Sequence, residues 1–265
     1  MSEDSSGSNG NQGADDISVF EDSEKTLTLM EEIFLLALKN ENGYVSFWNS
    51  SMPTGLRGCI LIELGLRGKV QLESKGILRK GLLRRHLTIK NDEPTGNALL
   101  DETLKHVKSM NPPDTVNNWI DYLTGNSWSP SKFGYQLRKV RERVAKNLVE
   151  KGILADGKKD FVLFDMIIHP LVDQEVKSQL IKKIQDALLS NWAKDPHRMD
   201  KRVLSLIIMA QAACTLDSAF VSLEDNHYKM AMARAKELFE LNCEVENRKS
   251  NGTDAVMWAV FAAFK

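Results

Sequence analysis

The sequence predicts a mainly α-helical protein: a single globular helical domain with a short apolar β-hairpin, preceded by a disordered acidic tail. Apolar residues recur at helical spacing in most segments after residue 25, and 42% of the 265 residues are hydrophobic, which is enough for a sizeable core. No linker rich in Gly, Pro or Ser and no internal repeat divides this part of the chain. We therefore assign residues 1–25 to the tail and residues 26–265 to one domain.

The tail differs from the rest of the chain in charge and composition. It holds seven acidic side chains and one lysine, whereas residues 26–265 hold 29 acidic and 34 basic side chains. Because the tail is rich in Ser, Gly, Asn and Asp and poor in bulky apolar residues, burial cannot offset the entropy of ordering it. Two roles stay open for it: a solubilising segment, which the composition favours, or a target of phosphorylation.

The domain begins with a predicted helix whose start is marked by a capping box. Thr28 and Glu31 have the spacing of that motif, and apolar residues then recur on one face as far as Asn40. A second helix is predicted at Leu56–Leu66 and ends before Gly68, a C-cap glycine. Further helices are expected at Leu99–Val107, Val116–Leu123, Tyr135–Glu150, Val176–Trp192, Arg202–Phe220, Tyr228–Leu241 and Ala255–Phe264.

Two segments depart from the helical pattern. Gly76–Lys90 mixes β-branched and basic residues without a clear period, so we expect it to be irregular or partly extended. Gly152–Leu154, a turn signal at Asp156-Gly157 and the apolar run after it predict a β-hairpin. The four apolar residues of that run are Phe161, Val162, Leu163 and Phe164. They are either buried against the domain or offered to a membrane or a second copy.

The predicted helix Tyr135–Glu150 carries a group of arginines. At 100° per residue, Arg138 and Arg141 lie on one flank of its apolar stripe and Arg143 lies on the other. Two guanidinium groups one turn apart can converge on one anion, and the arginine fork binds phosphate oxygens in pairs. The simpler interpretation is an exposed flank with a weak i, i+4 ion pair between Arg138 and Glu142. Spacing alone favours that simpler interpretation.

A tryptophan and an arginine bracket a turn earlier in the chain, beside an apolar helical stretch. Trp48 and Arg57 both fall in the run Gly43–Lys69. With the later arginines, they suggest a place where an anionic head group meets an aromatic ring.

Enzymatic chemistry has little support in the sequence. The five histidines show no ligand spacing, no Ser lies in a GxSxG motif, and no Gly-rich loop follows a strand, so we expect no catalytic residue, metal or cofactor. The three widely spaced cysteines fit neither a disulfide framework nor a zinc site and suggest a reducing compartment. No run of eighteen apolar residues and no signal-peptide pattern is present, so we expect a cytosolic protein unless something docks it elsewhere.

Several long segments together resemble one protein family, the Golgi phosphoprotein 3 family. The segments are TLTLMEEIFLLALK (26–39), GYVSFWN (43–49), GLRGCILIELGLRGK (55–69), LLDETLKHVK (99–108), YQLRKVRERVAKNLVEKG (135–152), LFDMIIHPL (163–171) and DPHRMDKR (195–202). The resemblance covers essentially all of residues 26–265.

The resemblance implies a peripheral, partly cytosolic protein that binds phosphatidylinositol 4-phosphate on the cytosolic face of the Golgi membrane. By the family pattern, the lipid head group would be bound by Trp48, Arg57, Arg138 and Arg141. The hairpin at Gly157–Ile168 corresponds to the family segment implicated in membrane insertion and in oligomerisation, which implies a homo-oligomer.

The implied role is that of a trafficking adaptor. Family members are thought to link the cytosolic tails of Golgi glycosyltransferases to retrograde vesicle coats, and to connect the membrane to actin through an unconventional myosin. This chain also departs from the family pattern, and two of the departures bear on these roles. Residues 1–24 contain no Lys or Arg, where relatives carry a basic coat-binding segment, and Pro53 is expected to shift the loop between Trp48 and Arg57.

A nucleic-acid-binding module is the main alternative function. The helix predicted at residues 135–150, followed by a hairpin, resembles the last helix and wing of a winged-helix fold. Against this alternative, the excess of basic over acidic side chains in residues 26–265 is small and the hairpin is apolar. Both features suit a lipid better than a phosphodiester backbone, so we expect no nucleic-acid partner.

Overall fold

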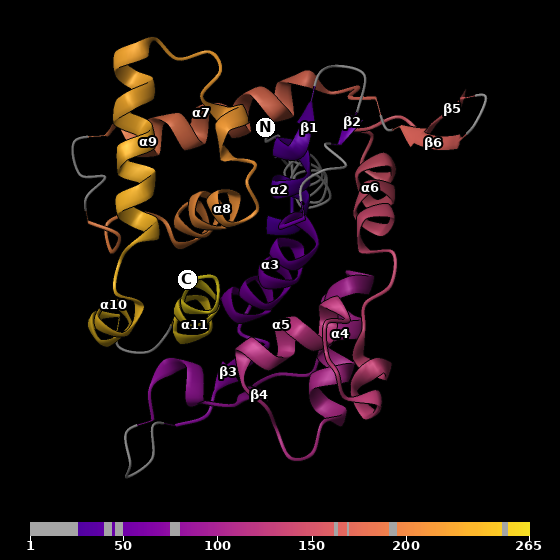
Figure 1. The fold of residues 1–265 in the computed structure, drawn as a ribbon, viewed down its shortest axis with the longest axis vertical. Coiled ribbons are helices and arrows are strands. Elements are labelled where there is room, and N and C mark those ends of the chain that lie inside the picture. The colour runs from indigo at the N-terminus through magenta and orange to yellow at the C-terminus, as the bar shows by residue number, and fades with distance from the viewer. Residues whose placement is uncertain are drawn as a thin grey trace, which may run out of the picture.

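The computed structural model describes residues 26–39, 44–45, 50–74, 80–161, 164–168, 170–190, 195–250 and 254–265, with residues 39, 44–45, 157–161 and 164–168 described by their backbone alone. The predicted disordered tail, residues 1–25, lies outside this part of the chain. The α-helices are α2 (Leu29–Ala37), α3 (Met52–Leu66), α4 (Ala98–Ser109), α5 (Val116–Thr124), α6 (Val140–Glu150), α7 (Gln174–Leu189), α8 (Lys201–Ala212), α9 (Asp225–Phe239), α10 (Cys243–Lys249) and α11 (Ala255–Ala263). Short 3-10 helices are η1 (Leu82–Arg84), η2 (Pro130–Tyr135) and η3 (Leu216–Ala219). The prediction of a mainly α-helical protein is confirmed (Figure 1).

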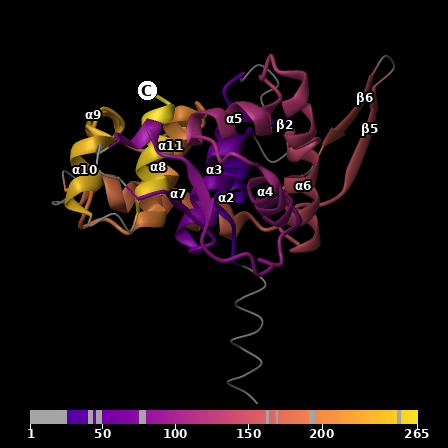
Figure 2. The same ribbon diagram turned by 90° about the horizontal axis from the view of Figure 1, so that it is seen from below.

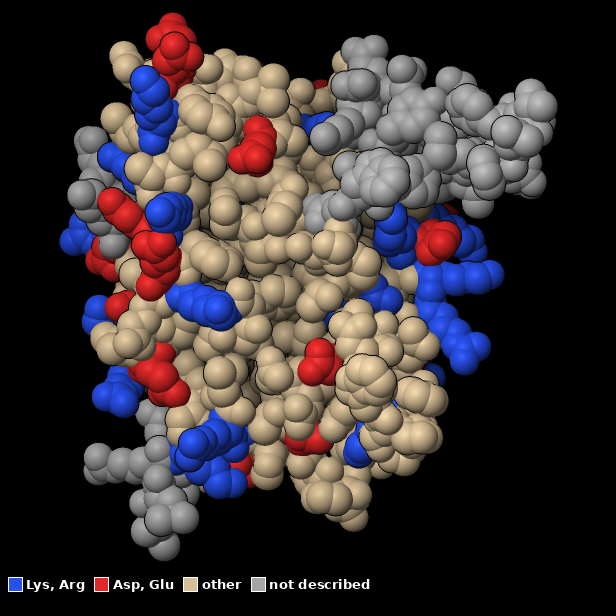
Figure 3. Space-filling model, viewed as in Figure 1, with Lys and Arg blue, Asp and Glu red and all other residues tan. Residues whose placement is uncertain are grey.

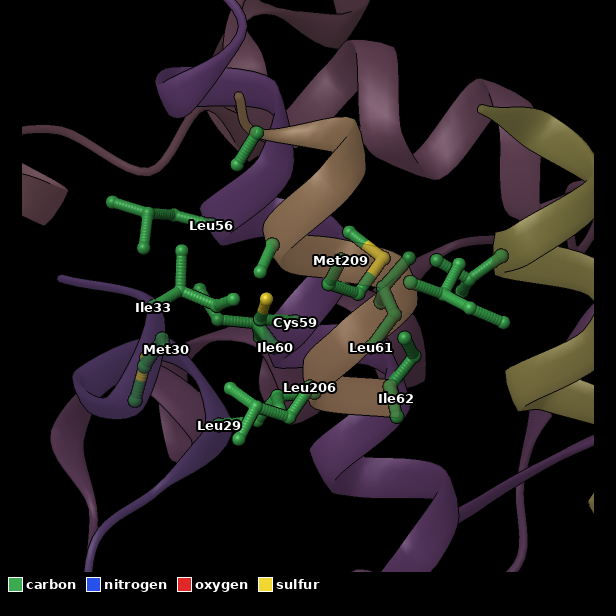
Figure 4. Packing of buried hydrophobic residues seen from close by; sticks show 14 of the residues in the cluster. Leu29, Met30, Ile33, Leu56, Cys59, Ile60, Leu61, Ile62, Leu206 and Met209 are labelled. Atoms are coloured by element: carbon green, nitrogen blue, oxygen red, sulfur yellow. The ribbon is translucent and has the colours of Figure 1, made fainter. Parts of the chain in front are cut away.

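Helix α3 lies at the centre of the fold. It contacts α2, α4, α5, α6, α8 and α11, so helices from both ends of the chain surround it. Its side chains are buried almost without interruption from Leu56 to Leu64, as expected of a helix that is apolar on every side. Figure 4 shows side chains of α2, α3 and α8 meeting in this core, with Ile33 facing Leu56 and Ile60.

Glycines allow neighbouring helices to approach α3 closely. A Cβ atom added at Gly58 would lie 2.6 Å from Cε2 of Phe264 and 2.8 Å from Cε of Met209. A Cβ atom added at Gly55 would lie 2.9 Å from Cβ of Ala213. These distances are shorter than real Cβ contacts, so a Cβ atom at either position would displace its neighbours. Cβ of Ala213 cannot rotate away from Gly55, whereas the Phe264 ring and Cε of Met209 are the ends of longer side chains.

The predicted capping box forms at the start of α2. The backbone N–H of Thr28 donates to the Glu31 carboxylate at 2.7 Å, and the backbone N–H of Leu29 donates to Glu63 of α3 at 2.8 Å. The Glu63 carboxylate also accepts from Arg202 of α8, at 3.1 Å. The entry of the chain into the domain is therefore fixed by buried, hydrogen-bonded carboxylates.

The second predicted helix starts earlier than expected. Helix α3 begins at Met52, so Pro53 lies in its first turn and not in a loop. Proline suits the first turn because no intrahelical acceptor is available there for its missing N–H. The predicted end is confirmed, because Gly68 follows the last turn with a φ of 65°.

The prediction for the arginine-bearing helix is wrong at its amino-terminal end. Helix α6 begins at Val140. Of the predicted first turn, Tyr135 is the last residue of the 3-10 helix η2, and residues 136–139 are not helical. Lys139 is left-handed, with a φ of 51°, and the backbone N–H of Leu137 donates to the carbonyl of Leu123 at 3.0 Å. The left-handed Lys139 breaks the helical path before Val140, and Leu137 is hydrogen-bonded to the end of α5.

The long predicted helix at residues 202–220 is interrupted. Helix α8 ends at Ala212, Cys214 is left-handed with a φ of 52°, and η3 follows. The backbone N–H of Thr215 reaches back to the carbonyl of Ala210 at 2.8 Å, which closes the end of α8. Helix α10 has no counterpart among the predicted helices, although Asn242 caps it by accepting from Val245.

Three antiparallel two-stranded sheets join the helices. They are β1 (Leu38–Lys39) with β2 (Tyr44–Val45), β3 (Val70–Leu72) with β4 (Leu87–Ile89), and β5 (Gly157–Phe161) with β6 (Phe164–Ile168). Strand β4 confirms that the segment before Lys90 is partly extended. In Figures 1 and 2 the β5–β6 hairpin extends away from the helical body.

The predicted hairpin exists, but the turn is not where its residue pattern suggested. Gly157 belongs to strand β5 and pairs with Ile168, whereas Phe161 pairs with Phe164. The two strands are therefore separated in sequence by residues 162–163 and not by Asp156-Gly157. Asp156-Gly157 has the composition of a turn, and the three charged residues after it, Lys158, Lys159 and Asp160, give no sign of a strand. The sequence therefore does not indicate that β5 begins at Gly157.

Candidate functional site

Basic residues surround the amino-terminal end of α6. Arg138 and Lys139 directly precede the helix and are exposed, and Arg141 in its first turn is partly exposed. The left-handed backbone of Lys139 turns the chain between Arg138 and the helix. Arg138 and Arg141 therefore do not lie one turn apart on a regular helix. They instead flank the point where the helix begins.

Arg143, further along α6, is already engaged. Its Nη1 donates to the Glu102 carboxylate of α4 at 2.6 Å. For Arg138, by contrast, no ion pair is found within the described ranges, so the expected pair with Glu142 is not observed there. The exposed charge of Arg138 is available to an external anion.

Arg57 is buried inside the domain, with 7% of its surface exposed. Its guanidinium donates to three backbone carbonyls: Nη1 to Pro53 at 2.9 Å, Nε to Leu123 at 3.2 Å, and Nη2 to Leu137 at 2.8 Å. Burial lowers the pKa of Arg57 to about 10, while the charge of Glu142 acts in the opposite direction. The side chain therefore still carries its charge at neutral pH.

These hydrogen bonds join three elements at one point. The carbonyl of Leu123 also accepts from the backbone N–H of Leu137, so the last turn of α5 and the residue before Arg138 are connected both directly and through Arg57. The Gln136 side chain adds a bond to the carbonyl of Thr124 at 3.3 Å. The backbone that presents Arg138 is consequently fixed to α3 and α5.

The structure brings only part of the predicted lipid site into view. Arg57 and Arg138 are connected through Leu137, and Arg141 follows within the next turn. Trp48 lies outside the described residues, and so do Val162 and Leu163 of the hairpin. Phe161 and Phe164 are described only as paired strand residues.

Basic side chains gather on one edge of the molecule. In Figure 3, Lys and Arg side chains cluster on the right-hand side over α6, above a largely uncharged surface. The described part of the chain contains no group of three or more His, Cys, Asp or Glu side chains that could hold a metal ion. None of its described helices combines the length and the apolar character needed to cross a bilayer.

Comparison with known proteins gives the family. A family model described as Golgi phosphoprotein 3 (GPP34) matches residues 29–259. The chain belongs to this family. Among curated relatives, Vacuolar protein sorting-associated protein 74 of Schizosaccharomyces pombe is 41% identical over 223 residues. The match covers 80% of this chain but 66% of the relative, so the chain spans just under two thirds of that protein's length.

Two features of this site were missed from the sequence. The first is the buried position of Arg57, for which the apolar residues on every side of it in α3 were an available signal. The second is the left-handed Lys139, which interrupts a segment of high helical periodicity. No residue pattern in KVRER signals that break, because the preceding Leu137 is bound to Leu123, fourteen residues before it.

Proposed function

We propose that this chain is a peripheral protein of the cytosolic face of the Golgi membrane that binds phosphatidylinositol 4-phosphate and acts as a trafficking adaptor. Family membership supports the Golgi role. The observation that carries the lipid-binding proposal is the exposed basic pair Arg138 and Lys139 at the start of α6, on a backbone fixed by Arg57.

The chemistry of this position suits a phosphorylated head group. The first turn of a helix leaves backbone N–H groups without intrahelical acceptors, and the helix dipole favours negative charge there. Arg138 and Arg141 add guanidinium forks that bind phosphate oxygens. We assign Trp48 to the inositol ring or to the lipid–water interface, which indoles prefer.

Arg57 has a different role in this proposal from that of Arg138. Three of its N–H groups are used by protein carbonyls, which favours a positioning role beneath the site over a clamp on the phosphates. Its buried positive charge also adds to the favourable potential for an anion. The proposed lipid site thus consists of the exposed Arg138 and the partly exposed Arg141, supported by the buried Arg57.

The hairpin supplies a second membrane signal. Insertion of Phe161, Val162, Leu163 and Phe164 would contribute about 1.5 to 3 kcal/mol for each side chain that leaves water. Each basic residue near an anionic leaflet adds about 1 kcal/mol. Since one anchor alone gives marginal binding, head-group recognition would select the membrane and insertion would prolong residence on it.

The protein partners rest on the family resemblance. They are the cytosolic tails of Golgi glycosyltransferases, a vesicle coat, an unconventional myosin that reaches actin, and further copies of this chain. Retention or retrograde transport of glycosyltransferases would follow from binding such tails and a Golgi lipid together.

Vesicle sedimentation tests the lipid site. Vesicles that contain phosphatidylinositol 4-phosphate should bring down the wild type but not Arg138→Ala/Arg141→Ala or Trp48→Ala. The matched control is Arg198→Ala/Arg248→Ala, which removes the same charge from two exposed arginines near α10, on the opposite side of the body. The control should sediment like the wild type.

Two outcomes would overturn the proposal. Unchanged sedimentation of both site variants would show that these residues do not bind the lipid. An equal loss of sedimentation in the control variant would show that binding depends on overall charge and not on this site. Preferential binding to duplex DNA, with no binding to the vesicles, would favour the winged-helix alternative, in which α6 and the hairpin after it contact a nucleic acid.

A further inference from the structure

The segment between α5 and α6 exposes two aromatic side chains. Trp128 is 99% exposed and Phe133 is 54% exposed, and they are the two large aromatic side chains that the described part of the chain exposes by more than half. Tryptophan is usually among the more buried residues of a domain, so a wholly exposed indole indicates a surface that meets something apolar. We call residues 126–135 the aromatic loop.

The aromatic loop is fixed at its base. The backbone N–H of Leu137 donates to the carbonyl of Leu123. The buried Arg57 guanidinium donates to the carbonyls of Leu123 and Leu137. Gly125, at the end of α5, has a φ of 89° and makes the turn into the loop. The loop therefore leaves and re-enters the domain at one pinned point, as a compact surface loop does.

The inner side of the aromatic loop is also anchored. Lys132 lies over the rings of Tyr122 and Tyr135, with its Nζ at 5.2 and 5.7 Å from their centroids. Its Nζ is also 3.0 Å from Sδ of Met110. These contacts hold the middle of the loop against the domain while Trp128 and Phe133 face solvent. Their exposure is therefore built into an ordered loop, which lowers the entropy cost of using it.

Charge selects the partner. Residues 126–139 contain three basic side chains (Lys132, Arg138 and Lys139) and no acidic one. An indole beside cationic side chains is typical of contacts with the interface of an anionic bilayer. In Figure 2 the aromatic loop, between α5 and α6, and the β5–β6 hairpin rise toward the same side of the molecule.

We propose that the aromatic loop is a separate membrane-contact element, which inserts Trp128 and Phe133 into the interfacial region of an anionic lipid membrane. The inference rests on the proposed membrane function and adds a third contact to the head-group residues and the hairpin. The apolar contact of the aromatic loop does not depend on the identity of the lipid head group, whereas the contact made by Arg138 and Arg141 does.

Binding to two kinds of vesicle tests this inference. Trp128→Ala/Phe133→Ala should bind about tenfold more weakly to vesicles of phosphatidylserine and to vesicles of phosphatidylinositol 4-phosphate, because apolar contact is lost in both. Arg138→Ala/Arg141→Ala should instead lose the preference for the phosphoinositide. The control Val221→Ala/Met230→Ala removes exposed apolar side chains, 85% and 42% exposed, beside and on α9, far from α6. It should bind like the wild type.

Fluorescence reports the position of the indole directly. Two further tryptophans, Trp48 and Trp192, are therefore replaced by Phe in the background used for this experiment. Lipids brominated on the acyl chain should quench part of the tryptophan emission of that background, and adding Trp128→Phe should remove the quenched part. Trp119 and Trp258 are wholly buried and out of reach of the quencher. Because Trp128 and Phe133 are exposed, the thermal stability of the variants should match that of the wild type.

The failures of the two proposals are distinguishable. A wild type that binds no vesicle overturns the membrane function itself. A wild type that binds, with a Trp128→Ala/Phe133→Ala variant that binds equally well and an unquenched indole, overturns the aromatic-loop contact alone. A variant whose oligomeric mass falls in light scattering while its vesicle binding is unchanged would reassign the loop to an interface between copies, and this too overturns the inference.

Discussion

The guanidinium of Arg57 donates to the carbonyl oxygen of Leu137, at a distance of 2.8 Å, and Leu137 is the residue directly before Arg138. A second bond from the same guanidinium reaches Leu123, at the end of α5. One buried side chain on the central helix thus fixes the backbone on which an exposed arginine is presented. In this way α3 joins the core of the domain to its basic edge.

Replacement of Arg57 by methionine should lower the free energy of unfolding by about 2 to 4 kcal/mol, because the carbonyls of Pro53, Leu123 and Leu137 each lose a hydrogen bond from the guanidinium. Arg57→Met keeps an unbranched apolar stem in place of the aliphatic part of arginine and removes the guanidinium, and urea denaturation measures the loss. Arg138→Ala is the control, because this exposed residue should leave stability within about 0.5 kcal/mol of the wild type. A fully stable Arg57→Met variant would contradict the positioning role.

The helical body was largely predictable because local signals agree with its packing. The capping box at Thr28 and Glu31, the apolar run after Leu56 and the glycine at position 68 each fixed a helix end or face from a few adjacent residues. Periodicity of this kind survives in the structure because the same residues are those that the core buries.

The candidate site was less predictable, because its geometry depends on contacts between distant residues. The start of α6 is set by Leu123 and by Arg57, which lies 80 residues before Leu137. The arginine spacing suggested one continuous helix flank, yet the left-handed Lys139 separates Arg138 from it. Residue types at the site could be recognised from the sequence, whereas the division between exposed and buried arginines could not.

Introduction of a methyl group at Gly58 should destabilise the domain by about 1 to 3 kcal/mol, because it overpacks the contact with Phe264 and Met209. Gly58→Ala would be measured by thermal and urea denaturation. Gly134→Ala is the matched control: nothing lies within 4 Å of its added Cβ, and its φ is not positive. Equal stability of the two variants would contradict the close approach of these side chains to α3.

The carboxylate of Glu63 should make stability depend on acidic pH. Burial raises the pKa of Glu63, but the charge of Arg202 and the hydrogen bonds from Leu29, Arg202 and Arg67 outweigh burial and hold it below its ordinary value. A carboxyl whose pKa is lowered by folding stabilises the fold above its unfolded pKa, and this contribution is lost as pH falls through the folded pKa. Glu32 acts in the opposite sense, because burial raises its pKa despite Arg202 and Lys183.

Glu63→Gln should therefore cost about 3 kcal/mol near pH 7, because it removes one partner of a buried ion pair. The cost should shrink as the pH falls through the lowered pKa of Glu63, where the wild-type carboxylate also becomes protonated. Urea denaturation of both proteins across this range measures the difference. Glu150→Gln, at an exposed site, should show a small cost at both ends of the range. If the cost of Glu63→Gln did not change with pH, the predicted coupling between protonation of Glu63 and stability would be contradicted.

Lys139 offers a way to separate backbone conformation from charge at the start of α6. Its φ of 51° is costly for any residue with a Cβ, by about 1 kcal/mol, and glycine avoids that cost. Lys139→Gly should therefore be more stable than Lys139→Ala, although both remove the same charge. Both should weaken binding to anionic vesicles to a similar extent, by about 1 kcal/mol, if the lysine acts through its charge. Weaker binding of Lys139→Ala alone would instead show that the left-handed turn, which sets the direction of Arg138, is the quantity that matters.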